Sequence, residues 1–304
     1  MAPTILLLGK NGQVGFELVR SLSLLGNVVA LGRVDCDLSD EAQIRSTVAR
    51  TSPAVIVNAA AYTLVDQAEE NVSVAESINA TAVGVLAELA HTSGAMLVHY
   101  SSDYVFAGDK TEPYVESDLP DPSSVYGRTK LAGECSIRER CARHLIFRTS
   151  WVFGVHGNNF LKRMLALMQT RRSLRVVADQ YGAPTSAILI AEVTAHAIAG
   201  YFSQRENDDF PYGTYHLTAA GCTTWHGYAQ RIARVAQGMG MPLNLSPDAI
   251  EAISTDEYPL PATRPANSQL DTSKLRHAFN LSLPPWERNV DFVLKQLLMG
   301  DCED

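Results

Sequence analysis

The sequence lacks the features of a disulfide-bonded, metal-binding or secreted protein. Its cysteines are odd in number, widely spaced and without a C-x-x-C pair, so neither a disulfide framework nor a zinc motif is indicated. They are Cys36, Cys135, Cys141, Cys222 and Cys302. The apolar stretch at residues 5–8 is only a strand in length and has no signal-peptide pattern, and no segment reaches about 18 uninterrupted apolar residues. We therefore expect a protein of the reducing cytoplasm, with no membrane partner.

Positive charge is also scarce. The formal net charge is -8, and the lysines and arginines are dispersed along the chain rather than clustered. Such a surface offers no electrostatic footprint for nucleic acid or for an anionic membrane. With 304 residues, of which 46% are hydrophobic and 19% charged, the chain can bury a full core. A soluble protein that acts on small molecules is the expectation.

Short apolar runs alternate with longer helical patterns through the first half of the chain. Alternation of this kind predicts a parallel sheet, and strands that are apolar throughout are covered on both faces. The fold class that we expect is therefore α/β, with a doubly wound parallel sheet of the Rossmann type. The candidate strands are residues 5–8, 28–31, 54–57, 96–100 and 145–147. The candidate crossover helices are residues 12–25, 40–51, 74–92 and 125–141.

The second half of the chain is less regular. Helical patterns at residues 160–170, 187–201 and 225–239 are separated by segments that contain proline and glycine. We expect a cofactor-binding domain at residues 1–150 and a smaller α/β lobe for substrate at residues 151–304, with some later segments returning to the first domain. The Pro-rich stretch at residues 103–124 is long enough to be functional, and we place it over the active site.

A glycine-rich loop follows the first predicted strand. Gly9, Gly12 and Gly15 stand between that strand and a predicted helix, the context that a dinucleotide motif requires. Glycines let the backbone turn tightly and approach a pyrophosphate, whose charge is met by the N-terminus of the helix. A glycine turn that binds nothing is the alternative interpretation. The loop predicts a nicotinamide dinucleotide cofactor.

Residues at the ends of the next two strands refine that prediction. Where an acidic residue would bind a ribose 2′-hydroxyl, the chain has Arg33, and arginine suits a 2′-phosphate better. We therefore favour NADPH over NADH, although a surface arginine without a role remains an alternative. Asp37 and Leu38 are candidates to flank the adenine. The small side chains of residues 59–61 let a cofactor lie close, or serve only for tight packing.

A phenol and an ammonium group lie four residues apart, at Tyr126 and Lys130. On a helix these positions share a face, and a neighbouring cation favours the phenolate. Ser102 lies just past an earlier strand, so all three side chains face the crevice outside the strand ends. We expect Tyr126 to donate a proton to a carbonyl oxygen, Ser102 to hydrogen-bond that oxygen, and Lys130 to contact the nicotinamide ribose and lower the pKa of Tyr126.

These motifs resemble those of the extended short-chain dehydrogenase/reductase superfamily and, within it, of the dTDP-4-dehydrorhamnose reductase family. Similar stretches run nearly from end to end, and the last three are the most specific. They are Gly9-Lys-Asn-Gly-Gln-Val-Gly15, Val57-Asn-Ala-Ala-Ala-Tyr-Thr63, Asp103-Tyr-Val-Phe106, Tyr126-Gly-Arg-Thr-Lys-Leu-Ala-Gly-Glu134, Arg148-Thr-Ser-Trp-Val-Phe153, Gly157-Asn-Asn-Phe160, Asp179-Gln-Tyr-Gly-Ala-Pro-Thr185 and Arg264-Pro-Ala-Asn-Ser268.

The resemblance implies an oxidoreductase that uses NAD(P)H to reduce the C4 ketone of dTDP-4-dehydro-L-rhamnose to dTDP-L-rhamnose, the last step in making a cell-envelope sugar donor. Its catalytic residues correspond to Ser102, Tyr126 and Lys130, with Ser102 where the family usually has Thr. The expected cofactor contacts are Gly9, Asn11, Gly12, Gln13, Val14, Arg33, Asp37, Leu38, Ala59, Ala60, Ala61, Tyr62, Thr63, Tyr100, Tyr126 and Lys130. The expected substrate contacts are Ser102, Asp103, Tyr126, Trp151, Asn159, Arg264 and Asn267.

Two of the substrate contacts also follow from side-chain chemistry. An indole can cover the apolar face of a deoxysugar, and Trp151 directly follows a predicted strand, although a core tryptophan is the alternative. The guanidinium fork of Arg264 could pair with a diphosphate, or else lie free on the surface.

One departure from the family concerns a metal. Some members bind Mg²⁺ through glutamates at a dimer interface, and the matching positions are Glu17, Ile188 and Glu287. An aliphatic side chain cannot ligate a hard cation, so we expect no metal site. Whether the protein forms a homodimer is not decided by the sequence.

Two other functions are alternative hypotheses. The chain could be another sugar-nucleotide enzyme, such as an epimerase or a dehydratase, but Asp103 and Tyr104 stand where dehydratases generally carry an Asp-Glu pair. A non-catalytic subunit resembling the regulatory subunit of methionine adenosyltransferase is the third hypothesis. The intact set of Ser102, Tyr126 and Lys130 favours an enzyme.

Overall fold

A six-stranded parallel sheet forms the centre of the computed structural model, which describes residues 2–204 and 209–300. The strand order is β2-β1-β3-β4-β5-β10, so the direction of winding reverses at β1. This reversal opens a crevice outside the carboxyl ends of β1 and β3. The strands are β1 (Thr4–Leu8), β2 (Asn27–Leu31), β3 (Val55–Asn58), β4 (Met96–Ser102), β5 (His144–Thr149) and β10 (Gly213–His216).

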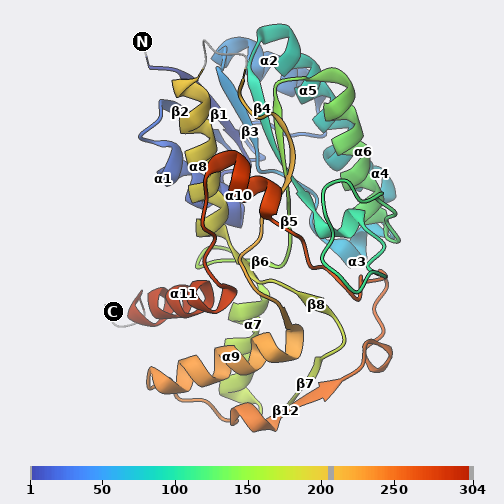
Figure 1. Ribbon diagram of the computed structural model, residues 1–304, viewed down its shortest axis with the longest axis vertical. Coiled ribbons are helices and arrows are strands. Elements are labelled where there is room, and N and C mark those ends of the chain that lie inside the picture. Colours follow the sequence, from blue (N-terminus) through green and yellow to red (C-terminus); the bar gives the residue numbers. More distant parts are fainter. Residues whose placement is uncertain (1, 205–208, 301–304) are drawn as a thin grey trace.

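Helices cover both faces of this sheet, as expected for strands that are apolar throughout (Figure 1). On one face, α1 (Gln13–Leu22) packs against α8 (Ala187–Ser203). On the other, α2 (Glu41–Thr51), α5 (Ala82–Ser93) and α6 (Val125–Arg140) pack side by side. The prediction of a doubly wound α/β sheet is confirmed, and β10 is the strand of this six-stranded sheet that the sequence analysis missed.

A long helix on the second face changes its hydrogen-bonding period in the middle. It runs from α4 (Val72–Glu76) through the π-helical turn η1 (Ser77–Thr81) into α5. By length and composition alone, residues 72–93 could cross a membrane. In the fold, α5 packs on α2, α6 and the sheet, and its residues from Ala82 to Ala87 are buried. These contacts are those of a core helix.

The C-terminal half contributes a second body below the sheet in Figure 1. There α7 (Phe160–Thr170), α9 (Trp225–Gly238) and α11 (Trp286–Gly300) pack near the paired strands β7 (Leu174–Val177) and β12 (Ile250–Ile253). Short elements complete the chain. They are α3 (Val65–Ala68), η2 (Asp103–Val105), β6 (Val152–Phe153), β8 (Tyr181–Gly182), β9 (Thr185–Ser186), β11 (Thr223–Thr224), η3 (Pro247–Ala249), η4 (Thr255–Glu257) and α10 (Ser273–Phe279).

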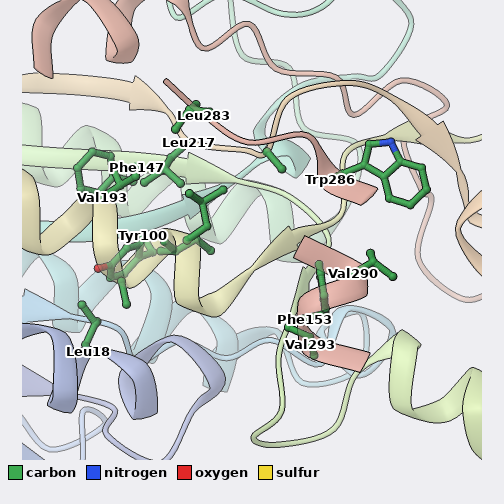
Figure 2. Close-up of a cluster of buried hydrophobic side chains, with 14 of the residues drawn as sticks. Leu18, Tyr100, Phe147, Phe153, Val193, Leu217, Leu283, Trp286, Val290 and Val293 are labelled. Atoms are coloured by element: carbon green, nitrogen blue, oxygen red, sulfur yellow. The ribbon is translucent and has the colours of Figure 1, made fainter. Parts of the chain in front are cut away.

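One hydrophobic cluster joins the two bodies. Figure 2 shows Tyr100 and Phe147 from the sheet in the same cluster as Phe153, Val290 and Val293 from the C-terminal half. β10 belongs to the sheet although it follows residue 150 in the chain, so the C-terminal half is partly built into the first domain. The boundary at residue 150 itself stays a prediction.

Only the start of the stretch at residues 103–124 lines the crevice, at Asp103 and Tyr104, so our placement of the whole stretch over the active site holds only there. Beyond η2 it packs against a distant segment, where Tyr114 forms an isolated bridge with Leu270. Its turn is closed by the Tyr114 hydroxyl, which accepts hydrogen bonds from the amides of Gly108 and Asp109. Glu116 accepts from the amide of His216 in β10, so the stretch is also tied to the edge of the sheet.

The described residues contain four of the five cysteines. Cys36, Cys135, Cys141 and Cys222 are free thiols there, and Cys302 lies outside the described residues. Across residues 2–204 and 209–300, no group of three or more His, Cys, Asp or Glu side chains is placed to hold a metal ion.

Candidate functional site

A cavity of about 990 Å³ runs across the carboxyl ends of the sheet strands. All of the residues predicted to contact the cofactor line it, from Arg33 and Asp37 at one end to Tyr126 and Lys130 toward the other. Ser102, Asp103 and Trp151 line it as well. The fold therefore brings together segments that are far apart in the sequence, as expected for the switch point of a doubly wound sheet.

The glycine loop is shaped to admit a phosphate group. Gly9 has a φ of +88°, and a Cβ on Gly15 would lie 2.0 Å from the Gly9 carbonyl oxygen, so both positions require glycine. Gly12 is the N-cap of α1 and offers no side-chain cap. The first amides of the helix therefore lack a side-chain acceptor, and residues 12–14 line the cavity, an arrangement that suits an anion. A dinucleotide pyrophosphate fits this loop.

The far end of the cavity is lined by an exposed arginine and a partly exposed aspartate. The Arg33 side chain is 78% exposed, and its Nε lies 3.4 Å from the Asp37 carboxylate. The pKa of Asp37 is lowered, first by the Ser39 amide and then by the Ser39 hydroxyl, so its carboxylate is ionised at neutral pH. This end therefore combines a cation that could pair with a 2′-phosphate and an anion beside it.

Ser102 ends β4 and caps the turn η2. Its hydroxyl oxygen accepts from the Tyr104 amide at 3.2 Å, and the hydroxyl donates to the Asp103 carboxylate at 2.9 Å. Asp103 is 3% exposed, and burial raises its pKa to about 6. The Tyr104 ring meets the Tyr126 ring edge to face, with centroids 5.5 Å apart. These contacts hold the serine next to the Tyr126 phenol.

The expected effect of Lys130 on the pKa of Tyr126 is wrong for this structure. Burial raises the pKa of Tyr126 to about 12, and the Ser102 hydroxyl opposes this rise. The Lys130 ammonium instead donates to the Tyr100 carbonyl at 2.6 Å, and burial lowers its own pKa to about 8. A spacing of four residues placed both groups at one cavity, but it did not determine which partner the flexible lysine takes.

A buried ion pair fixes the helix that carries Tyr126 and Lys130. Arg148 of β5 donates two hydrogen bonds to Glu134 of α6, at 2.8 and 2.6 Å. Burial acts to raise the pKa of Glu134, but the hydrogen bonds and charge of Arg148 outweigh it and hold that pKa below its ordinary value. Removal of Glu134 would leave the Arg148 charge buried without its partner, whereas removal of Arg148 would leave Glu134 paired with Arg138 alone. The pair with Arg148 therefore ties α6 to the sheet.

Asn79 holds the loop that follows β3. It lies in the π-helical turn η1 and is 1% exposed. Its side chain accepts from the Tyr62 amide and donates to the Tyr62 carbonyl, and it also donates to Thr129 of α6. The sequence analysis missed this residue, because an asparagine inside an apolar helical pattern gives no signal until the turn is known.

Three predicted substrate contacts do not line the cavity. Arg264 directs both ends of its guanidinium to the Asp66 carboxylate, at 2.9 and 2.8 Å. Asn267 is buried and donates to the carbonyls of Lys110 and Glu112. Asn159 is the N-cap of α7 and donates to Gln13, a residue that does line the cavity. All three are held by other parts of the chain.

The opposite end of the cavity contains a tryptophan that the sequence analysis did not identify. Trp225, the first residue of α9, lines the cavity and stacks on Trp151, with ring centroids 3.7 Å apart and planes at 15°. The only available signal was a tryptophan directly after the capping residue Thr224. That signal does not reveal which ring it meets.

Known proteins resemble this chain over nearly its whole length. The family model for the RmlD substrate binding domain matches residues 3–299. The dTDP-4-dehydrorhamnose reductase of Salmonella typhimurium is 48% identical over 297 residues, covering 96% of this chain and 97% of the relative. That of Escherichia coli strain K12 is 46% identical with the same coverage.

Solved structures of the same reductase also resemble the fold of this chain. A dTDP-4-dehydrorhamnose reductase from Bacillus anthracis in complex with NADP has a TM-score of 0.86 and 32% identity, covering 97% of this chain and 100% of that one. A Thermus thermophilus UDP-glucose 4-epimerase with NAD, at a TM-score of 0.75 and 17% identity, covers 97% and 99% and shares the fold alone. The resemblance seen in the motifs is confirmed, and the chain belongs to the RmlD substrate binding domain family.

Proposed function

We propose that this protein is an NADPH-dependent reductase that converts the C4 ketone of dTDP-4-dehydro-L-rhamnose to the alcohol of dTDP-L-rhamnose. The observation that carries the proposal is the cavity that brings Ser102, Tyr126 and Lys130 together beside a glycine loop. Relatives 46 to 48% identical over almost the whole chain bear the name of this reductase. Such a step belongs to dTDP-rhamnose biosynthesis.

Each side chain around the carbonyl oxygen has a separate role in the reduction. Tyr126 transfers its proton to that oxygen, and the Ser102 hydroxyl donates a hydrogen bond to it as negative charge develops there. NADPH, when bound, supplies the hydride to C4. The high pKa of the Tyr126 phenol keeps it protonated at neutral pH, as a proton donor requires. Lys130 is proposed to hold the ribose of the cofactor.

The choice of cofactor rests on the adenosine end of the same cavity. We favour NADPH because Arg33 lies at the adenosine end, and the Bacillus anthracis neighbour was solved with NADP. NADH remains usable, since Arg33 is largely exposed and paired with Asp37. We propose that the protein acts in the cytoplasm, where nucleotide sugars and reduced cofactors are made. A homodimer, if formed, would not use a metal ligand at Ile188.

Turnover with the sugar nucleotide tests this function directly. The purified protein is expected to oxidise one NADPH for each dTDP-4-dehydro-L-rhamnose reduced. Tyr126→Phe should lower kcat about 10²- to 10⁴-fold because the proton donor is lost, while the Kd for NADPH changes little. Tyr104→Phe removes the neighbouring phenol and serves as the matched control, with a much smaller expected loss.

Three outcomes would contradict the proposal. Equal rates for the wild type and Tyr126→Phe would remove the role of the phenol. Conversion of the sugar without net consumption of NADPH would favour an epimerase. Binding of NADPH with no turnover would favour a non-catalytic subunit.

A further inference from the structure

The segment at residues 179–185 lies directly behind the tryptophan pair of the cavity. It contains the short strand β8 and ends at the first residue of β9, and β8 pairs with β11, the strand that immediately precedes Trp225. At its other end, the Thr185 amide donates to the Trp151 carbonyl at 3.2 Å. One short segment is therefore connected to both indole-bearing residues.

Gly182 of this segment is required by the position of one indole. A Cβ on Gly182 would lie 2.7 Å from Cε2 and 2.9 Å from Cζ2 of Trp151, so any side chain there would displace the ring. Trp151 itself has a φ of 47°, which is unusual for a bulky residue and costs about 1–3 kcal/mol. Such a conformation persists only where the surroundings hold it.

Gln180 orients the other indole. The residue is 5% exposed, and its Oε1 accepts from Trp225 Nε1 at 3.1 Å. The amide nitrogen donates to the Thr255 hydroxyl at 3.1 Å, and that hydroxyl donates to the Asp179 carboxylate at 2.6 Å. An amide with a partner at each end has one orientation, so the Trp225 ring cannot rotate freely.

The two rings restrict each other. They stack at van der Waals separation, so a rotation of Trp225 would force Trp151 to move. Trp151 lines the cavity together with Ser102 and Tyr126. Because all three residues line one cavity, a sugar whose carbonyl is held by Ser102 and Tyr126 can extend its ring to the Trp151 indole. Trp151 would therefore contact the sugar of a bound substrate, and an indole suits the apolar face of a deoxysugar.

We propose that Gln180 and Trp225 are positioning residues for sugar recognition, acting through Trp151. The inference rests on the proposed function, and it assigns the segment at residues 179–185 to the sugar rather than to the nucleotide. The ligand class is a nucleotide-linked deoxyhexose with an apolar face toward the indoles.

Two ligands separate this role from a general loss of structure. Calorimetric titration compares dTDP-L-rhamnose with dTDP, which lacks the sugar. Gln180→Met removes the hydrogen bond to the indole, and Trp225→Phe removes the stacked indole. Each variant should bind dTDP-L-rhamnose about tenfold more weakly, the equivalent of one lost polar contact, and dTDP within about twofold. KM for the sugar substrate should rise more than kcat falls.

A spectroscopic signal reports on the rings without any ligand. Stacked indoles give an exciton couplet in far-ultraviolet circular dichroism, which Trp225→Phe should abolish and Gln180→Met should reduce. Gln237→Met is the matched control, because Gln237 also lies on α9 and donates to a carbonyl, that of Leu245 at 3.2 Å, but is not bonded to either indole. It should change neither the couplet nor the affinities.

The proposal is overturned if Gln180→Met keeps wild-type affinity for dTDP-L-rhamnose, or if it loses both ligands equally. It is also overturned if the Gln237→Met control shows the same sugar-specific loss. Failure of the wild type to bind either ligand would contradict the proposed function itself, and the sugar assignment with it.

Discussion

The two ends of the cavity are built in different ways. The cofactor end is made largely of two short segments, the loop from Gly9 to Gly15 and residues 59–63 after β3, and it acts largely through backbone geometry. The substrate end is assembled from side chains on distant segments, among them Ser102, Tyr126 and Trp225. Every predicted cofactor contact lines the cavity, whereas Asn159, Arg264 and Asn267 do not.

This difference shows what a local pattern can and cannot predict. A glycine required by backbone space is visible in the sequence, because its spacing to a strand and a helix is local. The partner of an arginine is not local. Asp66 takes both ends of the Arg264 fork from 198 residues away, and nothing near Arg264 in the sequence indicates that contact.

The largest effect should come from filling the backbone space at the cofactor end. Gly15→Ala places a Cβ 2.0 Å from the Gly9 carbonyl, so the loop must shift and the phosphate site with it. We expect the Kd for NADPH, measured by fluorescence titration, to rise at least about 100-fold, equivalent to about 3 kcal/mol. Gly238→Ala is the control, since a Cβ there meets nothing within 4 Å. If NADPH binding survives Gly15→Ala, the loop is not the phosphate site.

A moderate effect is expected from the ion pair between Asp66 and Arg264, which was predicted to be a substrate contact. Asp66→Ala removes the acceptor of two Arg264 hydrogen bonds and of the Ala262 amide, so the free energy of unfolding should fall by about 1–2 kcal/mol. Thermal unfolding measures this loss. Combining it with Arg264→Leu should be less than additive, as for residues in direct contact.

The same variant tests whether Arg264 can bind the substrate once its partner Asp66 is removed. Asp118→Ala, which removes a similarly exposed pair with Lys110, controls for destabilisation alone. If Asp66→Ala lowers KM for the sugar nucleotide while the control does not, then Arg264 binds the diphosphate once it is released. That result would return Arg264 to the substrate contacts that the sequence indicated.

Much of the fold follows from apolar runs. The strands β1 to β5 and their crossover helices were predictable because their side chains are buried on both faces of a parallel sheet. β10, with the sequence Gly-Thr-Tyr-His, has no such run. Its His216 is buried beside the Phe106 ring and Arg148, contacts that form only in the folded chain. Trp225 and Gln180 were missed for the same reason, since their roles depend on each other.

The smallest effect concerns Arg33, the charged side chain from which the preference for NADPH was inferred. Arg33 is largely exposed, and its pair with Asp37 is too open to water to stabilise the fold measurably. Arg33→Ala should therefore leave thermal unfolding unchanged and lower the ratio of kcat/KM for NADPH to that for NADH by about 3- to 10-fold, the share of one exposed contact to a 2′-phosphate. Arg171→Ala, at another exposed arginine, is the control. An unchanged ratio would mean that even at the cofactor end only the backbone pattern was informative, and that the 2′-phosphate is recognised by groups other than Arg33.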